Sequence, residues 1–143
     1  MSDVRTITTE EARNSLLKCF NKKRPVFLWG PPGIGKSELV EGIADSGVLG
    51  KTLAIDMRLA LFEPTDLRGY PVPDVASGVM KWLPPADLPT AEIAAEYDTV
   101  IVFLDELNSA APSVQAAAYQ LILNRRIGQY VLPENVVIIA AGN

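Results

Sequence analysis

The run Gly30-Pro-Pro-Gly-Ile-Gly-Lys-Ser37 carries residue types that bind phosphate, in the spacing G-x-x-x-x-G-K-[ST]. Glycines let the backbone turn back and present N–H groups to phosphate oxygens, and the lysine ammonium reaches the β- and γ-phosphates. The serine hydroxyl after the lysine is a ligand for Mg²⁺. The spacing therefore predicts a site for a nucleoside triphosphate with Mg²⁺, formed by Gly30, Pro31, Pro32, Gly33, Ile34, Gly35, Lys36 and Ser37. A glycine-rich turn that matches by chance is the alternative, but this run also lies between an apolar segment and an amphipathic one, as a strand–loop–helix unit requires.

Two carboxylates, Asp105 and Glu106, directly follow the apolar run Thr99–Leu104. A buried strand holds charge only at a cost, so both side chains are expected at the carboxyl end of the strand, where open α/β sheets bind ligands. Mg²⁺ takes one or two carboxylates with phosphate oxygens and water, which suits Asp105 and Ser37 as its partners. Glu106 then suits polarising an attacking water, which favours hydrolysis. A solvated acidic turn is the alternative.

The residue types that are missing narrow the chemistry. The sequence has no histidine and one cysteine, Cys19, which excludes Ser-His-Asp and Cys-His nucleophiles, His-ligated metals, a structural zinc site and an internal disulfide. The net charge of −4 argues against nucleic acid as a partner, because that partner needs basic surface. The basic run Lys22-Lys23-Arg24 follows a predicted helix, and cations are favoured at helix C-termini.

Length and hydropathy place the chain among soluble proteins. No apolar run approaches the roughly 18 residues that cross a bilayer, and the N-terminus lacks the apolar stretch of a signal peptide. A length of 143 residues, 48% of them hydrophobic, fits one globular domain. We therefore expect a cytoplasmic protein that does not enter a membrane.

Strands and helices alternate along the chain, which predicts an open α/β sheet. Continuous apolar runs are typical of parallel strands buried on both faces, and four are present: Val26–Trp29, Thr52–Met57, Thr99–Leu104 and Val136–Ala141. Helical spacing of apolar residues follows the capping box Thr8-x-x-Glu11 and recurs twice more. The three apolar faces are Ala12, Leu16, Leu17 and Phe20; Leu39, Val40, Ile43 and Ala44; and Val114, Ala117, Ala118, Leu121 and Ile122.

The stretch Glu63–Pro89 is rich in proline and cannot form a long helix. Within it, Tyr70–Pro73 and Val79–Leu83 are separated by the turn-forming Asp74–Gly78. This pattern predicts a β-hairpin that projects from the sheet.

These motifs together resemble the AAA+ ATPases, and within them the MoxR-like branch. The resemblance covers nearly the whole chain and rests on GPPGIGKS, on VIVFLDELNSAAPSVQAAAYQLI and on RRIGQYVLPENVVIIAAGN. The proline-rich piece DLRGYPVPDVASGVMKWLPPADLP resembles the β-hairpin that this branch inserts beside its second core helix.

The resemblance implies a fold and further site residues. AAA+ sheets run in the order 5-1-4-3-2, which implies here an α/β, P-loop NTPase-type open parallel sheet of order 1-4-3-2 with the fifth strand missing and a β-hairpin inserted. Residues 1–143 would then form a nucleotide-binding core that is incomplete at its C-terminus and lacks the helical lid. Asn143 falls where the family places the sensor-1 residue that positions the lytic water, and residues around Val4–Ile7 are expected near the adenine.

The resemblance also implies an activity. The chain is expected to bind ATP and Mg²⁺ and to hydrolyse ATP in a protein that remodels a partner or works through an adaptor, as a homo-oligomeric ring, commonly a hexamer. The sequence departs from the family at Leu107-Asn108-Ser109, where a hydrophobic residue, Asn and Arg are usual. The arginine finger would lie beyond Asn143, and because such a finger contributes about 10³–10⁵ in turnover, the isolated chain is expected to be slow or inactive. Arg125 or Arg126 could act across a subunit interface or cap a helix.

Two other classes of function stay open at this point. One is a catalytically weak nucleotide-binding interaction module, which the intact Glu106 argues against. The other is a P-loop kinase or GTPase, but the sequence has no Asn-Lys-x-Asp guanine signature and no evident acceptor site.

Overall fold

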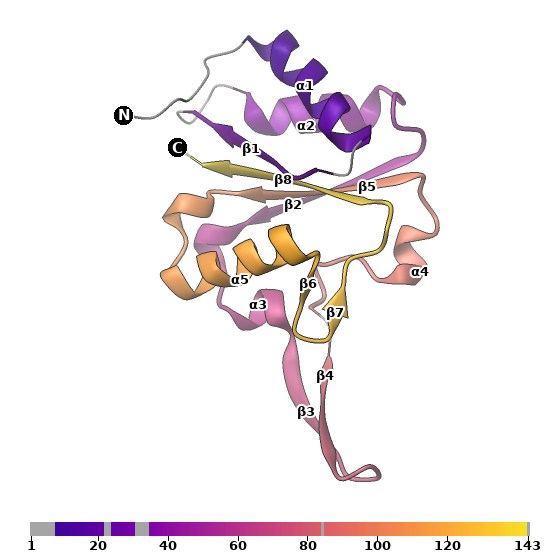
Figure 1. Ribbon diagram of the computed structural model, residues 1–143, viewed down its shortest axis with the longest axis vertical. Coiled ribbons are helices and arrows are strands. Elements are labelled where there is room, and N and C mark those ends of the chain that lie inside the picture. The colour runs from indigo at the N-terminus through magenta and orange to yellow at the C-terminus, as the bar shows by residue number, and fades with distance from the viewer. Residues whose placement is uncertain (1–7, 22–23, 31–34, 84, 143) are drawn as a thin grey trace.

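Four parallel strands form the centre of the computed structural model, which describes residues 8–21, 24–30, 35–83 and 85–142 (Figure 1). In order across the sheet they are β1 (Val26–Trp29), β8 (Val136–Gly142), β5 (Thr99–Asp105) and β2 (Thr52–Arg58). The register places Trp29 opposite Gly142 and Leu104 opposite Ala140. The predicted order 1-4-3-2 is therefore confirmed, since β8, β5 and β2 correspond to the fourth, third and second core strands.

The apolar runs form strands because both faces of the sheet are covered. β8 is buried along its whole length and β5 along all but its two end residues, whereas β1 and β2 lie at the edges of the described sheet and are only partly buried. The predicted bounds of β1 are correct, and the other three strands each extend one residue further than predicted.

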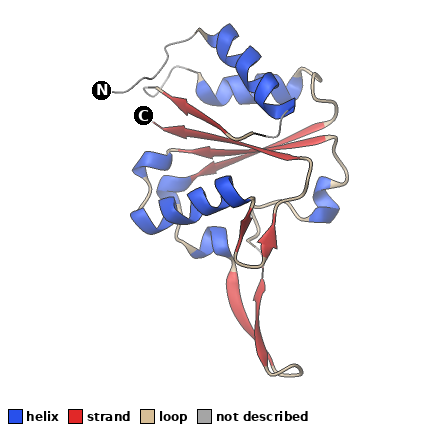
Figure 2. Ribbon diagram, in the orientation of Figure 1, coloured by secondary structure: helices blue, strands red, loops and turns tan. Residues whose placement is uncertain are grey.

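Helices pack on both faces of the sheet (Figure 2). On one face lie α1 (Thr9–Asn21) and α2 (Lys36–Asp45), whose buried residues contact Ile101 and Phe103 of β5. On the other lies α5 (Pro112–Asn124), where all five predicted apolar residues are buried: Val114, Ala117, Ala118, Leu121 and Ile122. The predicted cap of α1 is also confirmed, because Thr8 Oγ1 accepts a hydrogen bond from the Glu11 N–H at 3.2 Å.

The predicted hairpin projects away from the sheet (Figure 1). It consists of β3 (Tyr70–Asp74) and β4 (Val79–Leu83), which pair antiparallel. Its turn closes where Gly78, at φ 70°, donates its N–H to the carbonyl of Asp74 at 2.9 Å. That left-handed conformation suits glycine because it has no Cβ.

Several short elements were not predicted. They are the 3-10 turns η1 (Leu59–Leu61) and η2 (Leu107–Ser109), the one-turn helices α3 (Thr65–Arg68) and α4 (Ala91–Ala94), and a second hairpin of β6 (Arg126–Ile127) and β7 (Tyr130–Val131). Over the residues that the structure describes, none of the helices has the length and apolar character needed to cross a membrane.

Gly50 precedes β2 in a conformation that an alanine would strain. Its φ is 80°, and a Cβ there would lie 2.8 Å from the Cβ of Asp98, whose carboxylate accepts the Lys51 N–H at 2.8 Å. Gly50→Ala should therefore lower the free energy of unfolding by about 1–3 kcal/mol in chemical denaturation. The matched control is Gly42→Ala, inside α2, where a Cβ would meet nothing within 4 Å. This control should be stabilised by about 0.5–1 kcal/mol. Equal effects of the two substitutions would contradict the prediction.

Candidate functional site

The carboxyl ends of the four parallel strands meet at one edge of the sheet, where their arrowheads point in Figure 1. β1 ends at Trp29, directly before the predicted phosphate-binding run, and β5 ends at Asp105. The end of β8, Gly142, lies between them, because β8 pairs with both strands. The fold therefore brings the start of the phosphate-binding run and the acidic pair to the same edge of the sheet. This is the edge at which open α/β sheets bind ligands.

The chain passes from β1 into α2 by a sharp reversal. Gly30 donates its N–H to the carbonyl of Gly142 at 3.1 Å, which continues the β1–β8 pairing by one step. Gly35 caps α2 at φ 85°, a conformation in which a side chain would be strained. The predicted phosphate contacts at Pro31, Pro32, Gly33 and Ile34 lie outside the described residues.

Lys36, the first residue of α2, is half-buried, and its ammonium group contacts two carbonyls. Nζ donates to the carbonyl of Gly30 at 2.8 Å and to that of Gly142 at 2.9 Å. The positive charge is thereby held between the start of the phosphate-binding run and the end of β8. Ser37 follows in the first turn of α2 and is also half-buried. Phosphate oxygens would be stronger partners for this ammonium than neutral carbonyls, because they carry charge.

The acidic pair lies at the end of β5, as predicted, and both residues are half-buried. Glu106 has φ 57° and ψ 38°, and its N–H donates to Asp105 Oδ1 at 2.8 Å. A non-glycine residue in this left-handed region stores about 1–3 kcal/mol of strain, and such strain clusters at functional sites. The turn redirects the chain between Asp105 and η2.

Asp56 of β2 is a further acidic residue at this edge, which the sequence interpretation missed. Although the residue as a whole is exposed, partial burial of its carboxyl raises the pKa above the ordinary value. The charges of Asp105, Glu41 and Glu106 raise this pKa further, and Arg58 opposes the rise. An acidic residue near the end of an otherwise apolar strand was the available signal.

The donor set fits Mg²⁺ shared with phosphate rather than a metal held by protein alone. The described residues contain no group of three or more His, Cys, Asp or Glu side chains placed to hold a metal ion. Mg²⁺ characteristically takes one or two protein oxygens and completes its shell with phosphate oxygens and water. Ser37 and Asp105 are the two protein groups that could serve in this way.

The end of β8 is closely flanked. A Cβ on Gly142 would lie 2.9 Å from Trp29 Cε3 and 3.1 Å from Asn108 Oδ1, so only glycine fits without movement of a neighbour. Asn108 therefore lies beside the strand end that carries the Lys36 contact. The predicted sensor residue, Asn143, is the next residue in sequence and lies outside the described part of the chain.

A cavity of about 530 Å³ lies beside the loop, between α1 and α2. Its lining residues come from both helices and from the loop: Arg13, Gly35, Glu38, Leu39, Gly42, Ile43 and Ser46. The residues predicted near the adenine, Val4–Ile7, lie outside the described residues.

Of the two arginines considered for an interface role, Arg125 makes a hydrogen bond within its own chain. Arg125 ends α5 at φ 56°, and its Nη2 donates to the carbonyl of Pro133 at 2.8 Å. Burial lowers the pKa of its guanidinium. These contacts favour the helix-cap role for Arg125, whereas Arg126 is exposed.

In the parallel sheet, β1, the strand before the phosphate loop, pairs with β8, the strand that follows α5, and β8 pairs in turn with β5, which ends in the acidic pair. This is the strand arrangement of an AAA+ P-loop NTPase core. The sequence agrees: residues 25–143 match the family described as "AAA domain (dynein-related subfamily)". The chain belongs to this family of nucleotide-binding ATPase domains.

Individual relatives are consistent with this family. The chain is 32% identical over 120 residues to midasin of Giardia intestinalis, a match that covers 83% of this chain and 2% of midasin. Among solved structures, it is similar to a proposed ATPase from Cytophaga hutchinsonii ATCC 33406. The TM-score is 0.63 and the identity 18%, and the match covers 96% of this chain and 39% of that chain. It is also similar to NtrX from Brucella abortus, with TM-score 0.57, 16% identity and coverage of 97% and 31%. At these identities, the likeness to the two solved structures concerns the fold.

The raised pKa of Asp56 gives a stability prediction with a definite sign. Because the folded pKa lies above the unfolded one, the folded state loses stability as the pH rises from about 4 through the folded pKa. Asp56→Asn removes this loss, so the nucleotide-free protein should melt at a higher temperature than wild type at pH 7 and no higher near pH 3.5. Thermal melts followed by circular dichroism at both pH values measure the effect.

The matched control for Asp56→Asn has the opposite sign. A hydrogen bond from Lys81 lowers the pKa of Asp74, so ionised Asp74 stabilises the fold above about pH 4 and loses that effect as the pH falls through its folded pKa. Asp74→Asn should therefore melt slightly lower at pH 7. A melting temperature of Asp56→Asn that is unchanged or lower at pH 7 would contradict the raised pKa of Asp56.

Proposed function

We propose that this chain is the nucleotide-binding core of a MoxR-like AAA+ ATPase, which binds ATP with Mg²⁺ and hydrolyses it to remodel a partner protein. The observation that carries the proposal is the position of the Lys36 ammonium, between the carbonyls of Gly30 and Gly142 at the carboxyl edge of the sheet. Membership of the AAA domain family supports it. Residues 1–143 are proposed as one such core.

Lys36 is proposed to move from its two carbonyl partners to the β- and γ-phosphates when ATP binds. The exchange is favourable because charge-assisted hydrogen bonds are roughly twice as strong as neutral ones. Backbone N–H groups of Gly30–Ser37 would hold the remaining phosphate oxygens, helped by the positive end of the α2 dipole. The cavity between α1 and α2 adjoins this loop and has room for the base.

Glu106 is proposed as the group that orients and polarises the attacking water. Its left-handed backbone, whose N–H donates to Asp105 Oδ1, places the residue in the turn that directly follows β5. Asp105 and Ser37 would hold Mg²⁺, which would neutralise charge on the phosphates. Asn143 is proposed to position the same water, by its place at the end of β8.

The biological setting is part of the same proposal. A ring of identical subunits, commonly a hexamer, and a protein substrate or adaptor rest on the family. The MoxR-like branch rests on the inserted hairpin β3–β4 together with the sequence motifs. A cytoplasmic location rests on the single cysteine, which gives no sign of an oxidising compartment.

Lys36→Ala should abolish nucleotide binding. Losing one partner of a desolvated charge pair costs about 2–5 kcal/mol, which raises the dissociation constant roughly 30-fold or more. Titration with a fluorescent ATP analogue in the presence of Mg²⁺ measures this change. The control is Lys81→Ala, which makes the same change of charge on the exposed hairpin and should bind as wild type does. Unchanged affinity in Lys36→Ala would remove the basis of the proposal.

Glu106→Gln should keep ATP binding and lose turnover. Removing a general base costs about 10²–10⁴-fold in rate, whereas Lys36 and the loop are untouched. Phosphate release from ATP with the protein in excess measures turnover beside the binding titration. Glu96→Gln is the charge-matched control at an exposed residue that follows α4 and should release phosphate at the wild-type rate. Unaltered release in Glu106→Gln would assign the base elsewhere.

A further inference from the structure

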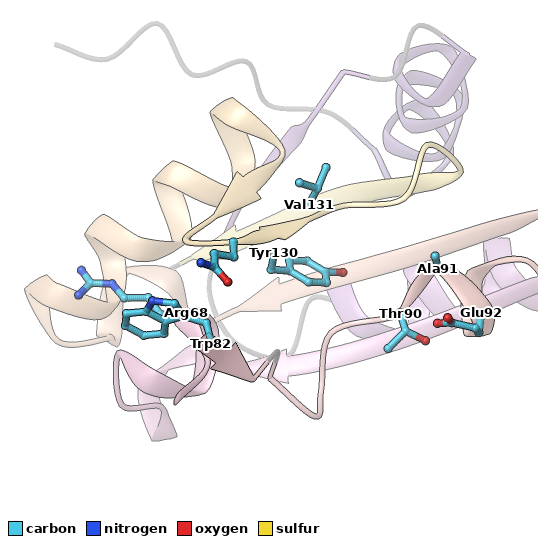
Figure 3. Close-up of a pocket in the computed structure, with 8 residues that line it drawn as sticks. Arg68, Trp82, Thr90, Ala91, Glu92, Tyr130 and Val131 are labelled. Atoms are coloured by element: carbon cyan, nitrogen blue, oxygen red, sulfur yellow. The ribbon is translucent and has the colours of Figure 1, made fainter. Parts of the chain in front are cut away.

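A second cavity, of about 360 Å³, lies on the α5 side of the sheet, at the base of the projecting hairpin. Four short elements converge on it: helix α3, β4 of the projecting hairpin, helix α4, and the β6–β7 hairpin (Figure 3). Its lining residues are Arg68, Trp82, Thr90, Ala91, Glu92, Gln129, Tyr130 and Val131. None of them belongs to the phosphate-binding loop or to the acidic edge.

The polar groups of this cavity fall into two sets. The first set consists of two groups that already have hydrogen-bond partners within the chain. Tyr130 donates its hydroxyl to the carbonyl of Pro89 at 2.6 Å, and Thr90 Oγ1 accepts the N–H of Ile93 at 3.2 Å. Burial also raises the pKa of Tyr130, so its phenol stays neutral and offers its ring. The other set is unused, because Arg68, Glu92 and Gln129 make no side-chain hydrogen bond or ion pair with any part of the chain that the structure describes.

The unused charges are of opposite sign and lie on opposite sides of the Tyr130 ring. Figure 3 shows Arg68 beside Trp82 on one side, and Glu92 beside Thr90 on the other. A ligand that fits this arrangement has an apolar middle for the two aromatic rings, an acidic group for Arg68 and a basic group for Glu92. Gln129 adds an amide that can pair with a peptide group.

The projecting hairpin extends this surface beyond the cavity. Paired residues of an antiparallel ladder share a face, and alternate residues return to it. Trp82 pairs with Pro71 and Met80 pairs with Pro73, so these four apolar residues share one face. The ion pair Lys81–Asp74, at 2.7 Å, lies on the opposite face. An uncharged stripe therefore runs from the cavity toward the hairpin tip.

We propose that this cavity and stripe bind an extended peptide segment of a partner protein, with an acidic and a basic side chain flanking apolar residues. A cavity of this size admits side chains but no folded domain. The stripe favours a polymer over a small molecule, because a ligand that fills the cavity can continue along Pro71, Pro73 and Met80. The site does not depend on the proposed ATP hydrolysis, since it shares no residue with that machinery.

Three short peptides capped at both ends test the proposal: Glu-Leu-Leu-Lys, Lys-Leu-Leu-Glu and the uncharged Gln-Leu-Leu-Gln. The chain has two tryptophans, so a Trp29→Phe background leaves Trp82 as the sole tryptophan, and fluorescence excited where tyrosine does not absorb reports on the cavity. One charged order should bind about threefold to tenfold more tightly than the other and than the uncharged peptide, because both exposed ion pairs form only in that order. Calorimetry on the unmodified chain gives the affinities independently.

Charge reversal makes the test specific to the cavity. The double variant Arg68→Glu with Glu92→Arg should prefer the opposite peptide order, and both positions are exposed, so the fold should tolerate the change. Lys36→Ala should keep wild-type peptide affinity, which separates this inference from the proposed nucleotide site. The proposal is overturned if no peptide binds at about 1 mM, if the order preference does not reverse, or if free glutamate and lysine bind as tightly as the peptides.

Discussion

The half-buried ammonium group of Lys36 is the charge around which this end of the molecule is organised. A desolvated cation needs oxygen partners, and Lys36 finds two carbonyls, of Gly30 and Gly142, that belong to neighbouring strands. Gly142 lies 106 residues away in sequence, so the contact exists only because β1 and β8 pair in parallel register. The phosphate loop is thus built on a strand pair as much as on its own glycines.

Several carboxylates lie close together at the same edge of the sheet, and their proximity destabilises the ionised form of Asp56. Asp56 lies two residues before the end of β2, Asp105 ends the neighbouring strand β5, and Glu106 follows in a left-handed turn. Partial burial, followed by repulsion from Asp105, raises the pKa of Asp56, and the turn at Glu106 stores strain. A cation bound between these carboxylates would offset the electrostatic part of this cost.

The sheet also separates two surfaces with different chemistry. The face covered by α1 and α2 carries the loop, whereas the opposite face carries α5, the two hairpins and the aromatic cavity (Figure 1). β8 and β5 contribute buried residues to both faces.

The sequence by itself determined the four core strands, the three long helices, the projecting hairpin and the positions of Lys36, Asp105 and Glu106. These could be predicted because a continuous apolar run, a helical apolar face and a turn-forming glycine are local properties that different tertiary contexts leave unchanged. The one-turn helices and β6–β7 carry too few residues for a period to show. Only the tertiary structure decided that Asp56 lies near Asp105, that Gly142 holds Lys36, and that Arg68 and Glu92 face one cavity. Those relations depend on the order of the strands and on contacts with backbone carbonyls. Every residue has a carbonyl, so the sequence does not indicate which of them makes such a contact.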